Sequence, residues 1–82
     1  RLVELIEAGV APEDLRTQEV IADHFRWVSQ FWSPNAESYV GLGDMYNDSP
    51  EFLERFNGIH PMLASFQRDA MAHYALNVLI NE

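Results

Sequence analysis

The stretch of residues 61–80 constrains the fold most, because its apolar residues cover almost the whole circumference of a helix. Only the sector that carries Ser65, Arg68 and Asp69 is clearly polar. A helix that is apolar nearly all round is a buried helix. The sequence therefore predicts a central helix over residues 61–80, with Phe66 in the core.

Residues 12–32 carry a second helical pattern, which opens with Pro12 and two acidic residues near its positive dipole end. The apolar arc of this pattern is wider than the roughly 100° stripe of an ordinary surface helix. We expect this helix to be the main partner of the central helix. The width of the arc also indicates contact with a second neighbour or with a ligand.

A third helix is predicted over residues 34–47 and a short fourth helix directly after it. One face of the third helix shows the spacing i, i+3, i+4 and i+7 in Tyr39, Leu42, Gly43 and Tyr46. Gly43 predicts close approach by another backbone or a bound group. Ser49 and Pro50 offer an N-cap and a first helical residue for the short helix. Asn57-Gly58 is expected to end that helix with a left-handed residue.

No alternation typical of strands occurs, so the sequence predicts an all-α fold of four or five helices. The 82 residues include 48% hydrophobic and 12% aromatic residues, enough for the core of one domain. The sequence starts at Arg1 directly in the apolar pattern of a helix over residues 2–8, which we expect Gly9 to end. We therefore expect the chain to be a fragment of a longer protein.

The net charge of −8 argues against a nucleic-acid-binding surface, because affinity for DNA depends on neutralising its phosphates. No apolar run approaches the roughly 18–20 residues of a membrane span, and no signal-peptide pattern occurs. The expected location is the cytoplasm. The absence of cysteine excludes disulfides and thiolate metal sites.

The chemistry-bearing residues do not favour an enzyme or a metal site. No nucleophile elbow is present, and His24, His60 and His73 form no His-x3-His pair. Asp69 and His73 have the i, i+4 spacing of two metal ligands, but the same spacing suits a simple side-chain contact. We expect no catalytic residue, no metal and no cofactor, with haem binding as a weaker alternative.

Tryptophan and tyrosine are the candidates for a binding site, because their rings are apolar and their tips are polar. They could equally fill the core. We predict a cleft between the helices over residues 12–32 and 34–47 that is lined by His24, Trp27, Phe31, Trp32, Tyr39 and Tyr46. In this cleft His24 would orient a ligand; the alternative is a core histidine bonded to a backbone carbonyl or an acid.

Several ordered pieces of the chain resemble a known family. They are IADHFR, ESYVGLGDMY, SPEFLERF and HPMLASFQRDA, which together cover about residues 21–75. They are similar to the TipAS domain, the antibiotic-recognition domain at the C-terminus of thiostrepton-induced activators of the MerR type. The resemblance implies a compact helical bundle with globin-like packing, which binds bulky apolar antibiotics or drugs in an aromatic cleft.

The resemblance also implies parts of the protein that are not in this sequence. These are an N-terminal arm that ligand binding orders, a winged helix-turn-helix domain that binds DNA, and a dimerising coiled coil. Residues 1–82 would be the core of the effector-binding domain. Where thiostrepton-binding members have a reactive cysteine, this sequence has Pro34, which implies reversible binding. The alternative function is a structural helical dimerisation or protein-interaction domain without a small ligand.

Overall fold

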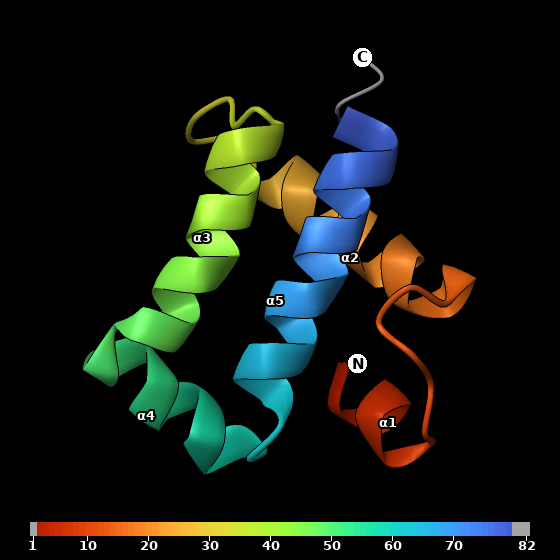
Figure 1. Cartoon of the computed structure of the whole chain (residues 1–82), viewed down its shortest axis with the longest axis vertical. Helices are drawn as coiled ribbons and strands as arrows, with labels where there is room; N and C mark the ends of the chain where they lie inside the picture. The colour runs from red at the N-terminus through yellow and green to blue at the C-terminus, as the bar shows by residue number, and fades with distance from the viewer. Residues whose placement is uncertain (1, 80–82) are drawn as a thin grey trace.

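The computed structural model describes residues 2–79, which form five α-helices and a π-helical turn without any strand. The elements are α1 (Leu2–Glu7), α2 (Leu15–Val28), α3 (Ala36–Asp48), α4 (Pro50–Ile59), α5 (Leu63–Tyr74) and the turn η1 (Ala75–Leu79). They form a body of 33 × 27 × 19 Å (Figure 1). The all-α prediction is confirmed. Within residues 2–79, no helix has both the length and the apolar character needed to cross a bilayer.

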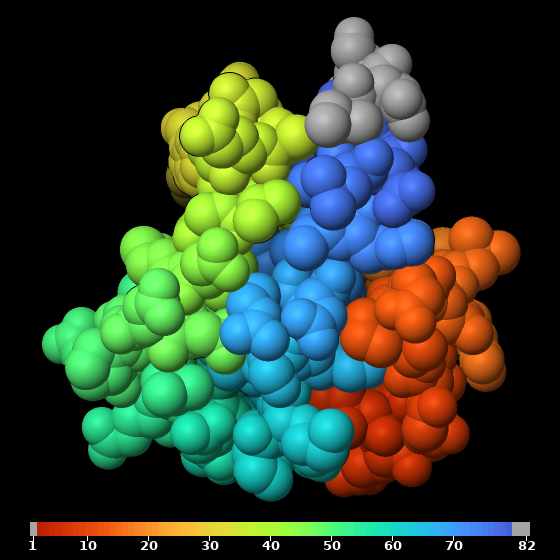
Figure 2. Space-filling model, in the orientation of Figure 1, coloured from red at the N-terminus to blue at the C-terminus, as the bar shows by residue number. Residues whose placement is uncertain are grey.

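Helix α5 is the centre of the molecule, as predicted, because it contacts each of the other four α-helices (Figure 1). Phe66 on this helix is only 7% exposed, which confirms its place in the core. The most extensive contact of α5 is with α3, so the prediction that the helix over residues 12–32 is its main partner is wrong. Figure 2 shows α3, α5 and the segment around α1 side by side on one face.

Gly43 explains why α3 and α5 pack so closely. A Cβ atom at this position would lie 3.3 Å from Cα of Arg68 on α5. The predicted close approach of a second backbone is therefore confirmed. Asn47, one turn later on α3, donates from its side chain to the carbonyl of Ala64 at 3.0 Å. The contact thus combines a small residue with a hydrogen bond that fixes the register of the two helices.

The fully buried hydrophobic side chains come from α2, α3, α5 and η1 and meet in one cluster. Its members have no exposed surface and are Ile21, Tyr39, Ala70, Met71 and Ala75. Small residues on α5 and η1 let the large Tyr39 ring enter the centre of the bundle. The core is therefore built around an aromatic residue rather than around aliphatic layers.

Helix α1 ends at Glu7, just before Gly9, the residue predicted to stop it, and Gly9 has a left-handed backbone. Gly9 has φ of +75°, and its N–H donates to the carbonyl of Ile6 at 3.0 Å. The N–H of Val10 donates to the carbonyl of Leu5 at 3.0 Å. These two bonds are those of a Schellman motif. The buried Val10 side chain anchors the turn that leads to α2.

Helix α2 is shorter at both ends than the predicted helix over residues 12–32. It begins after Asp14, whose carboxylate accepts from the N–H of Arg16 at 2.9 Å as an N-cap. It ends at Val28, where the hydroxyl of Ser29 donates to the carbonyl of Phe25 and competes with the helical bonds. Phe31 and Trp32 follow in non-helical backbone, so they do not continue the apolar arc of the helix.

Helix α3 begins at Ala36, two residues after the predicted start at residue 34. The side chain of Asn35 accepts from the N–H of Ser38, and the Ser38 hydroxyl accepts from the N–H of Asn35, which is a capping box. Pro50 is the first residue of α4, as predicted. Ser49 is the N-cap by position, although its side chain makes no capping hydrogen bond.

Two predicted helix ends are wrong. Gly58 does not stop α4, because its φ is not positive and the helix continues to Ile59. His60 ends the helix with extended backbone, just before Pro61. The central helix begins at Leu63 rather than at residue 61, and from Ala75 it widens into η1. Residue 80, the predicted end, lies outside the described residues.

Candidate functional site

The centre of the predicted site is a hydrogen bond between α2 and α3. Nδ1 of His24 lies 2.7 Å from the hydroxyl oxygen of Tyr39. Burial lowers the pKa of His24, which favours the neutral ring, and burial raises the pKa of Tyr39, which keeps its hydroxyl protonated. In the tautomer that carries the imidazole proton on Nε2, the Tyr39 hydroxyl donates and Nδ1 accepts.

The Tyr39 ring belongs to the core and has no exposed surface. Its edge meets the ring of Phe25 with centroids 5.2 Å apart, and the ring of Tyr74 lies 6.0 Å away. The backbones of α2 and α3 do not approach each other closely in the described residues, so these side chains bridge the two helices. Tyr39 therefore contacts the ring of His24 from inside the core.

The aromatic residues at the end of α2 lie at the surface. Trp27 is 58% exposed, Phe31 70% and Trp32 45%. The rings of Trp27 and Phe31 meet edge to face with centroids 5.1 Å apart, and the His24 ring lies 6.5 Å from that of Trp27. These contacts form a continuous row from Tyr39 through His24 and Trp27 to Phe31. We call the exposed rings Trp27 and Phe31, together with Trp32, which follows Phe31 in the chain, the aromatic surface.

Tyr46 belongs to a different group of rings. Its centroid lies 5.4 Å from that of Phe52 and 5.1 Å from that of Phe56, both on α4. Burial raises the pKa of Tyr46. Tyr39 and Tyr46 share a face of α3, but two turns of helix, about 10 Å, separate them. The structure thus brings His24, Trp27, Phe31 and Tyr39 together and places Tyr46 beside α4.

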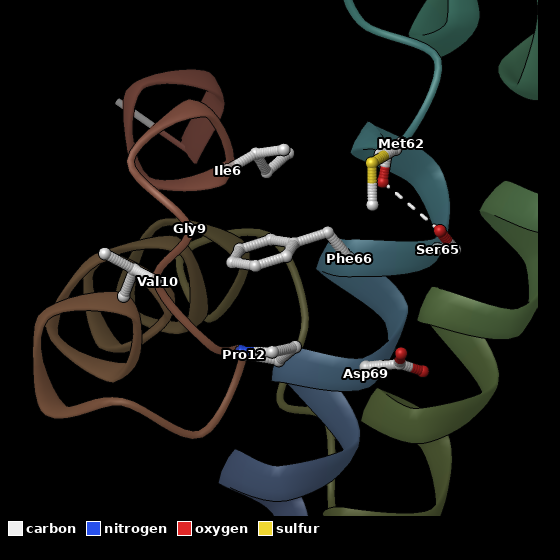
Figure 3. Close-up of a pocket in the computed structure, with 8 residues that line it drawn as sticks. All are labelled: Ile6, Gly9, Val10, Pro12, Met62, Ser65, Phe66 and Asp69. Carbon is white, nitrogen blue, oxygen red and sulfur yellow. Dashed lines mark hydrogen bonds between the residues drawn. The ribbon is translucent and has the colours of Figure 1, made fainter.

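A solvent-accessible pocket of about 310 Å³ lies elsewhere, between α5 and the segment that carries α1 and the turn after it (Figure 3). The residues that matter for its chemistry are Ile6, Pro12, Met62, Ser65, Phe66 and Asp69. The sequence reasoning missed this pocket. The only available signals were the apolar face of the first helix and the glycine that turns the chain back towards the central helix.

The remaining histidines make local contacts. Nδ1 of His60 accepts from the N–H of Met62 at 3.1 Å, and Nδ1 of His73 lies 3.4 Å from the side-chain nitrogen of Asn77. In residues 2–79, no group of three or more His, Asp or Glu side chains is arranged to hold a metal ion. Pro34 is buried just before α3.

Comparison with known proteins relates the chain to transcription regulators. A family model described as the TipAS antibiotic-recognition domain matches residues 1–74. Two curated relatives, from two strains of Caulobacter vibrioides, are each named HTH-type transcriptional regulator SkgA. Each is 28% identical over 76 residues, which cover 90% of this chain and 30% of the relative. No solved structure matches. The extent of the family match shows that the chain belongs to the TipAS antibiotic-recognition domain family.

Proposed function

We propose that the chain is the effector-binding domain of a bacterial MerR-type transcription regulator, which binds bulky, mostly apolar compounds reversibly. The observation that carries the proposal is the aromatic surface beside His24. Two of its rings, Trp27 and Phe31, are more than half exposed although they touch each other. Large exposed aromatic groups that lie together are typical of ligand or partner sites.

The chemistry of this surface suits an apolar ligand with a few polar atoms. Stacked and edge-on ring contacts contribute about 0.5–1.5 kcal/mol beyond area burial and do not demand one ligand shape. Nδ1 of His24 is engaged by Tyr39, which leaves the Nε2–H as a donor towards a ligand carbonyl. His24 would thus orient the compound, with Tyr39 fixing its tautomer.

Binding would be reversible, because the sequence contains no cysteine that could attack a ligand. The net charge of −8 makes this domain unsuited to DNA. The chain spans about 30% of the length of its curated relatives. We therefore assign DNA binding and homodimerisation to other parts of a longer cytoplasmic regulator, and no catalysis to this domain.

Titration with Nile red, an uncharged apolar dye, tests the proposal. A dye that enters the aromatic surface should shift its emission to the blue and stabilise the domain. At 100 times the dissociation constant, the free energy of unfolding should rise by about 2.7 kcal/mol. The double variant Trp27→Ala/Phe31→Ala should weaken binding at least about tenfold, which is about 1.4 kcal/mol.

Leu15→Ala is the matched control, because Leu15 is an apolar residue, 74% exposed, at the other end of α2. This variant should bind the dye normally. Equal losses in both variants would contradict the proposal. So would sedimentation showing that the domain is a dimer that separates only in the aromatic variant, which would instead support the alternative of a structural interaction domain.

A further inference from the structure

The pocket between α1 and α5 has an apolar body and a polar rim. Figure 3 shows Ile6 pointing from α1 towards Met62, while the ring of Phe66 crosses the space between α5 and the turn at Gly9. Ser65 and Asp69 lie four residues apart on α5 and so share one face at the rim. The volume of about 310 Å³ is near the lower end of the range for ligand sites.

The charge of the lining selects the kind of head group that the pocket can accept. Asp69 is acidic, and the residues that line the pocket in the described chain include no arginine or histidine. Arg68 lies next to Asp69, but both of its contacts, at 3.3 Å, go to Oδ1. Oδ2 of Asp69 takes part in neither of these contacts. An anionic ligand would meet the carboxylate of Asp69, in a chain whose net charge is −8, while Arg68 is already paired with Oδ1.

We propose that this pocket is a second ligand site, separate from the aromatic surface, for small primary amines with an aromatic or alicyclic body. The apolar body would lie against Phe66, Met62 and Ile6. The ammonium group would donate to Oδ2 of Asp69 and to the hydroxyl oxygen of Ser65. That hydroxyl donates to the carbonyl of Met62 at 3.2 Å and therefore keeps lone pairs for the ligand.

The size of the pocket limits the ligand. A water molecule occupies about 30 Å³ in the liquid, so the pocket holds about ten non-hydrogen atoms. A compound of this size is expected to bind with a dissociation constant on the order of 0.1–1 mM. The site therefore suits an abundant small metabolite-like amine rather than a bulky antibiotic.

A ligand in the pocket would stabilise the contact between α1 and α5. No residue of α1 is buried, a property that α1 shares with α4. A ligand that touches Ile6 and Phe66 at once would add contacts across this junction. Amide hydrogens of Gly9 and Val10, which are bonded to Ile6 and Leu5, should then exchange more slowly.

Three probes with the same aromatic body test the proposal by NMR titration of the isotope-labelled chain. Phenethylamine is cationic, 2-phenylethanol is neutral and 3-phenylpropionate is anionic. The amine should bind in the stated range and shift the signals of Ile6, Val10 and Phe66. The alcohol should bind about tenfold more weakly, because it lacks the charge-assisted bond, and the carboxylate should not saturate.

Variants separate the pocket from general attraction to an acidic protein. Asp69→Asn should bring the affinity for the amine to that for the alcohol. Glu54→Gln removes the same charge from an exposed position on α4 and should leave binding unchanged. Ser65→Leu should block both probes while circular dichroism confirms that the helices remain.

Three outcomes would overturn the proposal. These are equal affinity for all three probes, equal losses in Asp69→Asn and Glu54→Gln, and probe-induced shifts centred on Trp27 and Phe31. The test is independent of the proposed function, since Trp27→Ala should leave amine binding intact. Failure of Nile red to bind would likewise say nothing against the amine site.

Discussion

The hydroxyl of Tyr39 lies 2.7 Å from Nδ1 of His24, and this bond joins two helices whose backbones do not meet closely in residues 2–79. Tyr39 is fully buried, whereas His24 is partly exposed at the edge of the aromatic surface. The bond therefore connects the core directly to the proposed binding surface. Protonation of the imidazole would remove the lone pair with which Nδ1 can accept from Tyr39, which makes the contact sensitive to pH.

Tyr39→Phe should lower the free energy of unfolding by about 1–2 kcal/mol, because it removes a buried donor and leaves Nδ1 of His24 without it. Urea denaturation measures this change. Tyr46→Phe is the matched control, since the ring of Tyr46 is held by contacts with Phe52 and Phe56. A loss as large in the control as in Tyr39→Phe would contradict the assigned bond.

The stability of the domain should fall as the pH decreases below about 6.5, the ordinary pKa of histidine. Burial lowers the pKa of folded His24, so the unfolded chain takes up its proton first. Between the two pKa values the unfolded state binds more protons, and the free energy of unfolding therefore rises with pH.

Urea denaturation at pH 7 and pH 5 measures this effect. In His24→Gln the free energy of unfolding should differ less between these two pH values. Asp14 does not interfere in this window. The side-chain bond from Arg16 lowers the pKa of Asp14 below 3.8, so its contribution is lost only in stronger acid. A stability that increases between pH 7 and pH 5 would refute the role assigned to His24.

Alanine should have opposite effects at different glycines. Gly9→Ala should destabilise by about 1–2 kcal/mol, because φ is +75° and a Cβ atom is strained there. Gly41→Ala should stabilise by about 0.5–1 kcal/mol, since this helical glycine has open space around it. Gly43→Ala should cost about 1–3 kcal/mol by forcing α3 away from Arg68 on α5. Thermal and urea unfolding of the three variants check the order.

Two phenylalanines should respond very differently to truncation. Phe66→Ala should cost about 3–5 kcal/mol, because Phe66 is 7% exposed and its removal leaves a cavity. Phe31→Ala should change stability by less than about 0.5 kcal/mol, because Phe31 is 70% exposed. Similar values for the two variants would show that the aromatic surface is part of the fold.

Trp32→Ala should weaken binding of an apolar ligand far more than it lowers the melting temperature, because Trp32 is 45% exposed. Tyr46→Ala tests whether the site extends to the second group of rings. Loss of the contacts with Phe52 and Phe56 should lower the melting temperature in this variant. Normal dye binding by folded Tyr46→Ala would remove Tyr46 from the predicted site.

Local signals in the sequence were sufficient for much of the fold. Gly9 after α1 and Pro50 at the start of α4 act within one turn of backbone, so their effects are readable from neighbouring residues. The apolar circumference of the last helix also indicated its central position. The order of the four motifs in residues 21–75 indicated the TipAS family.

Only the tertiary structure decided which large side chains are buried. Tyr39 and Phe31 both fit an apolar helical pattern, yet Tyr39 is fully buried and Phe31 is 70% exposed. Their difference depends on where α2 ends and on the small residues Ala70 and Ala75 that face Tyr39. Tertiary packing also decided that α3 is the main partner of α5 and that a pocket lies beside Phe66. Such contacts join residues far apart in the chain, and their energies depend on shape complementarity that periodicity does not encode.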